Sequence, residues 1–257
     1  MSMPADPGSS PWIRRYASVP DASVRLVCLP HAGGSAPFYS ALAKSLSPDI
    51  EVIGVQYPGR LERWQEPLLE NLAELADILT GELLPLAEGD LALFGHSLGT
   101  MVAFEVARRL QAHGRTPIHL FASGRGAPSR HQREFSERPD DSTLIQLMRG
   151  LGGTDPRVLD DEELVRIALP VLRADYTLVD TYRYEPGPML NCPVTALNGK
   201  EDHKVTAADA EAWCEHTTGS FESVLFPGGH FYLVDQHAEV TSTLASRLAD
   251  SRGSRSH

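Results

Sequence analysis

The sequence has few cysteines and no long apolar run. Its three cysteines, Cys28, Cys192 and Cys214, are an odd number without the paired spacing of zinc ligands. We therefore expect reduced thiols, with neither a disulfide framework nor a metal site. No stretch approaches the roughly 18 apolar residues that a membrane-spanning helix needs, and the N-terminus has no apolar signal core. These absences predict a cytoplasmic protein without a membrane partner.

Positive charge is also scarce. Lys and Arg number 23 against 34 Asp and Glu, which gives a formal net charge of −11. Such a surface disfavours binding to nucleic-acid phosphates and to anionic membranes, so neither is expected as a partner. The 257 residues, 42% of them hydrophobic and 22% charged, have the composition of a globular protein that is long enough to bury one large core.

Strand-like and helix-like segments alternate along most of the chain. Amphipathic patterns separate short apolar runs at 24–29, 51–56, 91–96, 118–123, 193–198 and 221–226. An edge strand is expected near 12–17 and a final helix over 239–248. This alternation predicts an α/β fold with a mostly parallel sheet and helices on both faces.

The ends of the chain differ in composition from its middle. Residues 1–11 are rich in Pro, Gly and Ser, and we expect them to be disordered. Residues 12–250 are expected to form one domain, with a frayed segment at 251–257.

The alternation stops between residues 127 and 190. A charged stretch there is followed by helical patterns near 144–151 and 162–182, and Pro170 is expected to kink or divide the second of these. A helical insertion between two core strands has the form of a lid, although a helical subdomain without gating fits equally well.

The most informative stretch is 91–99, where an apolar run leads directly into Gly-His-Ser-Leu-Gly and a helical pattern follows at once. This is typical of a nucleophile elbow, in which a serine lies on a tight strand-to-helix turn with its hydroxyl exposed. Gly95 and Gly99 flank Ser97 where a side chain would collide with a neighbouring element. We interpret Ser97 as a nucleophile, with a chance match in a loop as the alternative.

A serine hydroxyl needs a base, and in this fold the order along the chain is serine, acid, histidine, each after a strand. Among ten histidines, His230 lies in a glycine-rich turn after the last expected strand and is the predicted base. His203 competes with it, although it precedes that strand. Asp202, in the turn after 193–198, is the predicted acid that would orient His230, with Glu201 as the alternative.

A glycine-rich turn at 30–35 follows the first strong strand. Its spacing fits neither the dinucleotide fingerprint nor a lysine-containing phosphate loop. In hydrolases with a serine elbow, such a turn lends a backbone N–H to the oxyanion hole. The predicted donors are therefore the backbone N–H groups of Ala32 and Leu98.

Other residues of the insertion have two interpretations. Four apolar residues could line an acyl pocket, namely Leu144, Leu147, Met148 and Leu151. Ordinary core packing is the competing interpretation. Asp175 and Asp180 lie on the second helical segment and are interpreted as structural.

Five short motifs are more restrictive together than the elbow alone. They are Leu-Pro-His-Ala-Gly-Gly-Ser at 29–35, Gln-Tyr-Pro-Gly-Arg at 56–60, Phe-Gly-His-Ser-Leu-Gly at 94–99, Leu-Pro-Val-Leu-Arg-Ala-Asp-Tyr at 169–176 and Gly-Gly-His-Phe-Tyr at 228–232. Together they resemble the type II thioesterases, free-standing editing hydrolases of polyketide synthases and non-ribosomal peptide synthetases. The resemblance spans about 12–250. The family often has Met where this chain has Leu98, but the backbone N–H is what acts there.

The resemblance implies an α/β-hydrolase whose helical lid, matching 127–190, covers an acyl chamber. It implies hydrolysis of acyl groups from the phosphopantetheine thiol of an acyl or peptidyl carrier protein, in an editing or priming role. The enzyme would be a monomer without a cofactor, because the substrate brings the phosphopantetheine. Arg125, Arg130 and Arg133 are candidate docking contacts, with a solvated face as the alternative. A small-molecule carboxylesterase and a catalytically idle carrier-binding module are the alternative functions.

Overall fold

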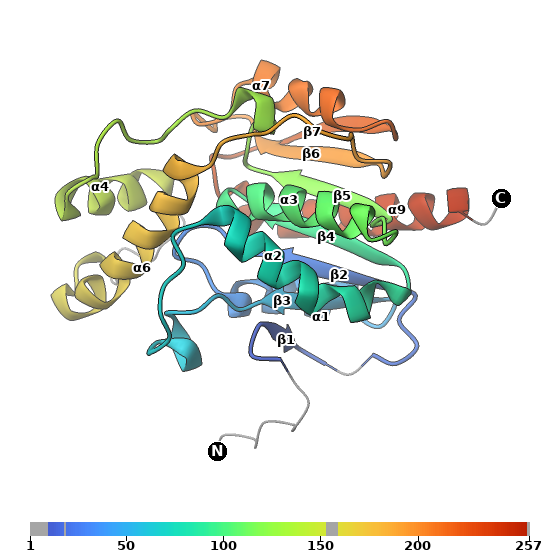
Figure 1. Cartoon of the computed structure of the whole chain (residues 1–257), viewed down its shortest axis with the longest axis horizontal. Helices are drawn as coiled ribbons and strands as arrows, with labels where there is room; N and C mark the ends of the chain where they lie inside the picture. The colour runs from blue at the N-terminus through green and yellow to red at the C-terminus, as the bar shows by residue number, and fades with distance from the viewer. Residues whose placement is uncertain (1–9, 18, 153–158, 256–257) are drawn as a thin grey trace.

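The computed structural model describes residues 10–17, 19–152 and 159–255. A seven-stranded sheet runs through its centre (Figure 1), in the spatial order β1 (Ile13–Arg15), β3 (Ile50–Val55), β2 (Val24–Leu29), β4 (Leu91–His96), β5 (His119–Ser123), β6 (Val194–Gly199) and β7 (Phe221–Phe226). β1 pairs antiparallel with β3, and the other neighbouring strands are parallel. The expected mostly parallel α/β fold is confirmed, and β1 is the expected edge strand.

Helices cover both faces of the sheet, as expected (Figure 1). One face carries α2 (Leu72–Leu83) and α3 (Leu98–Ala112), and the other carries α1 (Ser40–Leu46) and α9 (His237–Arg255). Each face buries its own apolar cluster. Because both faces are covered, β3, β4, β5 and β6 are buried along their whole length and are mostly apolar.

Short helices connect the larger elements. They are η1 (Ala36–Tyr39), η2 (Leu61–Arg63), η3 (Leu84–Glu88), η4 (Pro128–Arg130), α7 (Ala207–Glu211), η5 (Ala212–His216) and α8 (Tyr232–Asp235). The segment after the first glycine-rich turn forms η1 and α1, and α8 follows the turn that carries His230.

The C-terminal helix is longer than the sequence predicted. The fraying expected at 251–257 is wrong for residues 251–255, which continue α9. The buried side chain of Ser251 provides the reason, because its Oγ is hydrogen-bonded to Nδ1 of His119 on β5 at 2.8 Å. Residues 1–9 and 256–257, also predicted to be disordered or frayed, lie outside the described residues.

A helical insertion lies between β5 and β6. It contains η4, α4 (Asp141–Leu151) and α6 (Glu162–Thr181), and the two longer helices lie beyond the carboxyl ends of the central strands (Figure 1). Pro170 does not divide α6, contrary to expectation, because the residues that follow it, Val171 and Leu172, are buried and hold the helix in place. The predicted function of the insertion as a lid stays a prediction.

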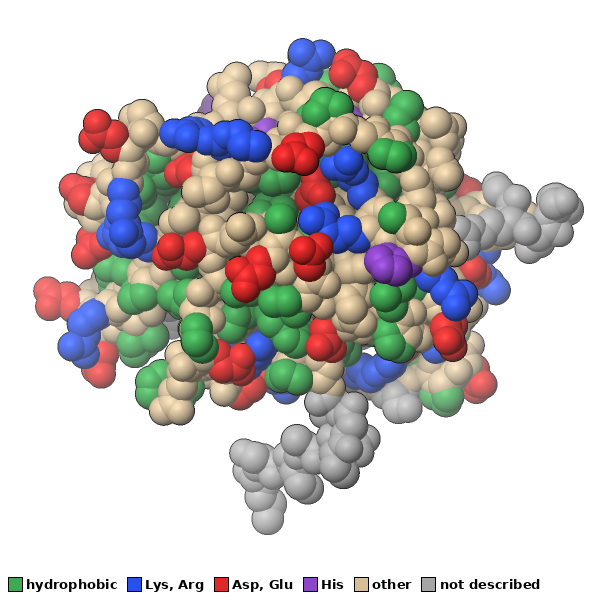
Figure 2. Space-filling view, viewed as in Figure 1, with side chains coloured by type: hydrophobic (Ala, Val, Ile, Leu, Met, Phe, Trp, Pro, Cys, Tyr) green, Lys and Arg blue, Asp and Glu red, His purple; other side chains and the backbone are tan. Residues whose placement is uncertain are grey.

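Charges of both signs are mixed on the surface. On the face shown in Figure 2, Lys and Arg side chains are interspersed with Asp and Glu. The candidate docking residue Arg125 is mostly buried and bound to Glu134 (2.8 Å), so it is a poor partner contact, whereas Arg130 is half exposed beside Glu215 (3.2 Å). Among the described residues, no helix is both long and apolar enough to cross a bilayer.

Candidate active site

Ser97 lies at the junction of β4 and α3, where the sequence predicted a nucleophile elbow. Its backbone has φ 55° and ψ −116°, a conformation that is costly for a residue with a side chain and that clusters at functional sites. A Cβ on Gly95 would collide with the carbonyl oxygen of Gly99, and one on Gly99 would collide with that of Leu29. The two glycines therefore permit the close approach of strand and helix that the turn requires.

The elbow is fastened to the end of β5 by hydrogen bonds. The Ser97 N–H donates to the carbonyl oxygen of Ser123 at 2.8 Å. The Thr100 hydroxyl lies 2.8 Å from the carbonyl oxygens of both Gly95 and Ser123. These contacts hold the strained turn in a single conformation, and the sequence pattern did not reveal them.

Asp202 and His230 form a buried pair. His230 Nδ1 lies 2.8 Å from Asp202 Oδ2, and the second carboxylate oxygen accepts the Lys204 N–H at 2.9 Å. A Cβ on Gly199 would collide with the carbonyl oxygen of Gly229, so glycine there allows the turns after β6 and β7 to meet. The predicted acid and base are thus in contact.

The competing residues lie elsewhere. His203 is exposed. Glu201 is also exposed and accepts the Gly228 N–H, so it supports the turn before His230 and does not contact the imidazole in any described hydrogen bond.

The His230 ring lies beside the elbow. Its centroid is 5.1 Å from that of His96, the residue before Ser97. A Cβ on Gly124, which has φ +61°, would lie 3.4 Å from His230 Cε1 and 2.6 Å from His96 Cε1. Glycine at the end of β5 therefore leaves room for both rings.

A hydrogen-bond chain behind the elbow joins three parts of the site. His96 Nδ1 is 2.9 Å from Ser123 Oγ, which is 2.7 Å from the Tyr232 hydroxyl. All three side chains are buried. The chain connects β4, β5 and the segment after His230, and the sequence pattern did not reveal the hydrogen bonds of Ser123 and Tyr232.

The neighbouring histidines have lowered pKa values. Burial, with the nearby His230 and Arg60, lowers the pKa of His31 to about 3. Burial, with His230 and His31, likewise lowers the pKa of His96 well below its usual value. Groups this weakly basic are poor proton acceptors near neutral pH, which disfavours both as the general base.

The two predicted oxyanion donors come from different parts of the fold. Leu98 is the first residue of α3, and Ala32 lies in the turn after β2. In that turn Gly34 N–H donates to the His31 carbonyl oxygen at 2.9 Å, and Gly33 N–H donates to Asp175 Oδ2 at 2.7 Å. The turn is therefore fixed on both sides of Ala32.

Asp175 was interpreted as structural, but it lies next to the predicted oxyanion hole. Its carboxylate also forms an ion pair with Arg60, and both side chains are less than 10% exposed. The Tyr-Pro-Gly-Arg and Arg-Ala-Asp motifs that the sequence analysis singled out thus meet in space. The presence of both motifs in one sequence could have indicated the ion pair between Asp175 and Arg60.

The candidate acyl-pocket residues belong to a small packed cluster. Leu144 is fully buried with Leu172 and Tyr176, and Leu147 and Met148 pack against them together with Ala32. Leu151 ends α4 and is half-buried. Met148 lines a small cavity of about 10 Å³, with room for about one water molecule. The residues pack as a core here, and their contact with an acyl chain stays a prediction.

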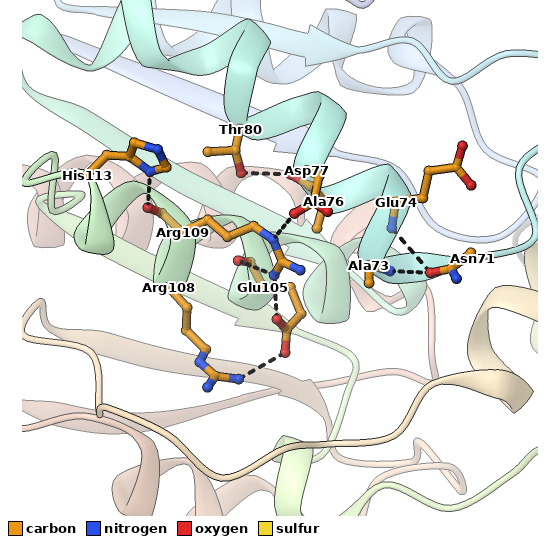
Figure 3. Close-up of polar contacts among 10 residues, drawn as sticks. All are labelled: Asn71, Ala73, Glu74, Ala76, Asp77, Thr80, Glu105, Arg108, Arg109 and His113. Atoms are coloured by element: carbon orange, nitrogen blue, oxygen red, sulfur yellow. Dashed lines mark hydrogen bonds and ion pairs between the residues drawn. The ribbon is translucent and has the colours of Figure 1, made fainter.

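A larger cavity, of about 770 Å³, lies between α2, α3 and the segment 181–188, away from these residues. Its polar lining includes Glu105, Arg108 and Arg109, which bind one another (Figure 3). These side chains satisfy one another's charges, so we interpret the cavity as a groove between elements.

Comparisons with known proteins show the family to which the chain belongs. Residues 24–248 match the family model for the thioesterase domain. The chain is 45% identical over 252 residues to the thioesterase PikA5 of Streptomyces venezuelae, covering 97% of this chain and 90% of that protein. It is 38% identical over 230 residues to the gramicidin S biosynthesis protein GrsT of Aneurinibacillus migulanus, covering 88% of this chain and 90% of that protein.

Solved structures show the same fold. The type II thioesterase BorB from the borrelidin biosynthetic cluster superposes with a TM-score of 0.85 at 44% identity, covering 95% of this chain and all of that one. YbtT, a type II thioesterase from the yersiniabactin pathway, superposes with a TM-score of 0.83 at 29% identity. The match covers 93% of this chain and 99% of that one. The chain therefore belongs to the thioesterase family of α/β-hydrolases, among the type II thioesterases of polyketide and non-ribosomal peptide pathways.

Proposed function

We propose that the protein hydrolyses acyl thioesters from the phosphopantetheine arm of acyl or peptidyl carrier proteins, in an editing or priming role. One observation carries this proposal: a buried Asp202–His230 pair lies beside a serine on a positive-φ elbow in a thioesterase fold. Relatives named for polyketide and peptide pathways supply the expectation of a carrier-bound substrate.

In the first half-reaction, Ser97 Oγ attacks the thioester carbonyl carbon while His230 Nε2 takes its proton. Asp202 accepts the Nδ1–H, which fixes the tautomer and stabilises the imidazolium. The N–H groups of Ala32 and Leu98 stabilise the oxyanion. The C–S bond then breaks, and His230 gives the proton to the departing thiolate sulfur. A thiol of pKa about 8.5 leaves readily, so serine activation and the oxyanion are the steps that need help.

In the second half-reaction, His230 removes a proton from water as its oxygen attacks the carbonyl carbon of the acyl-Ser97 ester. The bond from that carbon to Ser97 Oγ then breaks, and His230 returns the proton to Oγ as the acid is released. The enzyme needs no cofactor of its own for either step, because the phosphopantetheine arrives with the substrate. Each step uses residues of one chain, which is consistent with a monomer.

The test is intact-mass monitoring of carrier proteins loaded with acetyl, butyryl and longer acyl groups. Ser97→Ala and His230→Ala should each lower kcat by at least about 10⁴-fold, because nucleophile and base act as a unit. His203→Ala is the matched control, since His203 is exposed on the same turn as Asp202, and it should stay within about twofold of wild type. Retained turnover in folded Ser97→Ala would contradict the proposal.

Two further measurements separate the alternatives. Faster hydrolysis of small soluble esters than of carrier-bound thioesters would favour a carboxylesterase. A serine-directed phosphonate should add one mass adduct, on Ser97. Absence of both adduct and turnover, with carrier binding retained, would favour an idle binding module.

A further inference from the structure

The helical insertion places a buried carboxylate against the oxyanion turn. Asp175, on α6, is 3% exposed, and its Oδ2 accepts the Gly33 N–H at 2.7 Å. Gly33 directly follows Ala32, the proposed donor. A backbone amide that donates to a carboxylate is held more strongly than one that donates to a neutral acceptor.

The peptide group that contains the donor is held from both sides. The Ala32 N–H and the His31 carbonyl belong to one planar trans peptide, so they point in opposite directions. That carbonyl accepts the Gly34 N–H at 2.9 Å, and Asp175 holds the next peptide through the N–H of Gly33. Fixing these two groups sets the direction of the Ala32 N–H.

Arg60 provides the counter-charge and connects a second turn. Its guanidinium binds Asp175 and also donates to the Pro58 carbonyl oxygen at 2.8 Å. The Gln56 amide donates to the Arg60 carbonyl oxygen at 3.3 Å and accepts the Ala36 N–H at 3.0 Å. The turns after β2 and β3 are thus joined to each other and to α6.

Side-chain packing restricts the turn further. Gly33 has φ +75°, and a Cβ there would lie 2.8 Å from Leu172 Cδ2 on α6. Ala32 packs against the cluster of Leu144, Leu172 and Tyr176. The turn therefore lies between the insertion and β2 with little room to move.

We propose that Asp175, paired with Arg60, is a positioning residue that aims the Ala32 N–H at the developing oxyanion. The helical insertion then completes the oxyanion hole and is more than a cover for the acyl chain. This inference rests on the proposed function, because it assigns to Ala32 the role of donor.

The competing explanation is that the ion pair only fastens the insertion to the sheet. Glu105 offers a matched control, since it is 8% exposed and binds Arg108 and Arg109 (Figure 3). It also accepts the hydroxyl proton of Tyr182, just after α6, at 2.9 Å. Glu105 thus fastens the far end of α6 to α3 without contacting the oxyanion turn in any described interaction.

The experiment compares steady-state kinetics on an acyl carrier protein with thermal unfolding. Asp175→Ala should lower kcat about 10²-fold with KM within about threefold, as expected when an oxyanion donor is misplaced. Asp175→Asn retains an oxygen that can accept the Gly33 N–H, so its kcat should fall only about tenfold. Glu105→Gln should lower the unfolding temperature while kcat stays within about twofold.

A paired variant separates positioning from stability. Asp175→Ala leaves the Arg60 charge buried without a partner, which is strongly destabilising, whereas Arg60→Met with Asp175→Leu removes both charges. This double variant should unfold near the wild-type temperature and still lose about 10²-fold in kcat, because Gly33 has lost its acceptor. If Asp175→Ala does not fold, the double variant and Asp175→Asn carry the test.

Inhibitor binding identifies the affected step. An acyl-pantetheine trifluoromethyl ketone forms a tetrahedral oxyanion on Ser97, and its affinity should fall in parallel with kcat/KM. An amide analogue with a neutral carbonyl should bind each variant within about threefold of wild type. Equal loss for ketone and amide, or unchanged kcat in the double variant, would overturn the inference. If wild type hydrolyses no carrier thioester, the proposed function fails, while ketone binding still decides the role of Asp175.

Discussion

The parallel sheet and the helical insertion bury their apolar residues in different ways. The sheet is covered on both faces, and most of its strand residues are fully buried. In the insertion, among the described residues, three buried side chains form the centre of one small cluster, and α6 exposes Leu164 and Ile167. The sheet therefore has a core of its own, whereas the insertion depends on contacts with its neighbours.

Several of the polar contacts of the insertion involve carboxylates. Asp175 binds Arg60, and Glu134 binds Lys204 at 2.7 Å, beside Asp202. Asp180 accepts the Glu134 N–H at 2.7 Å. Lys204 lies in the turn that carries Asp202, and Asp175 also accepts the N–H of Gly33 beside Ala32. Changes in the insertion are therefore expected to reach the chemistry through electrostatics and alignment more than through bulk packing.

The largest effect is expected from the carboxylate that the sheet supplies. Asp202→Asn should lower kcat on a carrier-bound thioester about 10⁴-fold, because an amide no longer favours the tautomer of His230 that can accept the serine proton. The loss should exceed that of Asp175→Ala by about 10²-fold, which would sharpen the contrast between a triad carboxylate and a positioning one.

Steady-state kinetics with both variants, at matched folded fraction by circular dichroism, measures this contrast. Equal losses in the two variants would mean that the insertion shares the acid–base chemistry, and the comparison between the two regions would then break down.

The sheet and its turns could be predicted from the sequence because their signals are local. Apolar runs ending in Gly-rich turns located β2, β4 and β7, and chain order alone selected Asp202 and His230, which are in contact. The Ser97 elbow was recognisable because the close approach of strand and helix requires glycine at positions 95 and 99, and these glycines are visible in the sequence.

The polar networks could not be predicted in the same way. Asp175 and Arg60 are 115 residues apart, and Ser123 and Tyr232 are 109 apart. Periodicity carries no information about such pairs. The length of α9 was missed for a similar reason, because Ser251 is held by a residue on β5. Local propensity at Pro170 was likewise overridden by the burial of its neighbours.

A second prediction compares one leucine from each region. Leu79 in the sheet core and Leu144 in the insertion are both fully buried. Leu79→Ala should lower the free energy of unfolding by about 4 kcal/mol, because the surrounding core is too rigid to close the cavity. Leu144→Ala should lower it by about 2 kcal/mol, since the small cluster can collapse and the insertion can open locally.

Urea unfolding gives the global values, and hydrogen exchange resolves the regions. In Leu144→Ala, faster exchange should be confined to α4 and α6, whereas in Leu79→Ala it should extend through the sheet. If both variants lost the same free energy of unfolding and both showed faster exchange over the same residues, the insertion and the sheet would unfold as one unit.

The smallest effect is a pH dependence of stability. His119 on β5 is buried between Ser251 Oγ (2.8 Å) and Thr195 Oγ1 (2.9 Å), and burial lowers its pKa to about 4. Between pH 6.5 and 4 the unfolded chain binds this proton and the folded chain does not, so stability is fully present above pH 6.5 and falls as the pH drops. By pH 5 the loss from this group should be about 2 kcal/mol.

His131 in the insertion tests whether this loss is specific to the sheet. Burial and the charge of Arg125 lower its pKa, also to about 4, but its side chain is only partly buried. Urea unfolding between pH 7.5 and 5 should show a flatter slope for His119→Gln and a slope closer to wild type for His131→Gln. Local opening of the insertion can expose His131 to solvent and so remove the cost of protonating it. Exposure of His119 requires the sheet and α9 to separate. A larger change in slope for His131→Gln would therefore place the insertion inside the cooperative core.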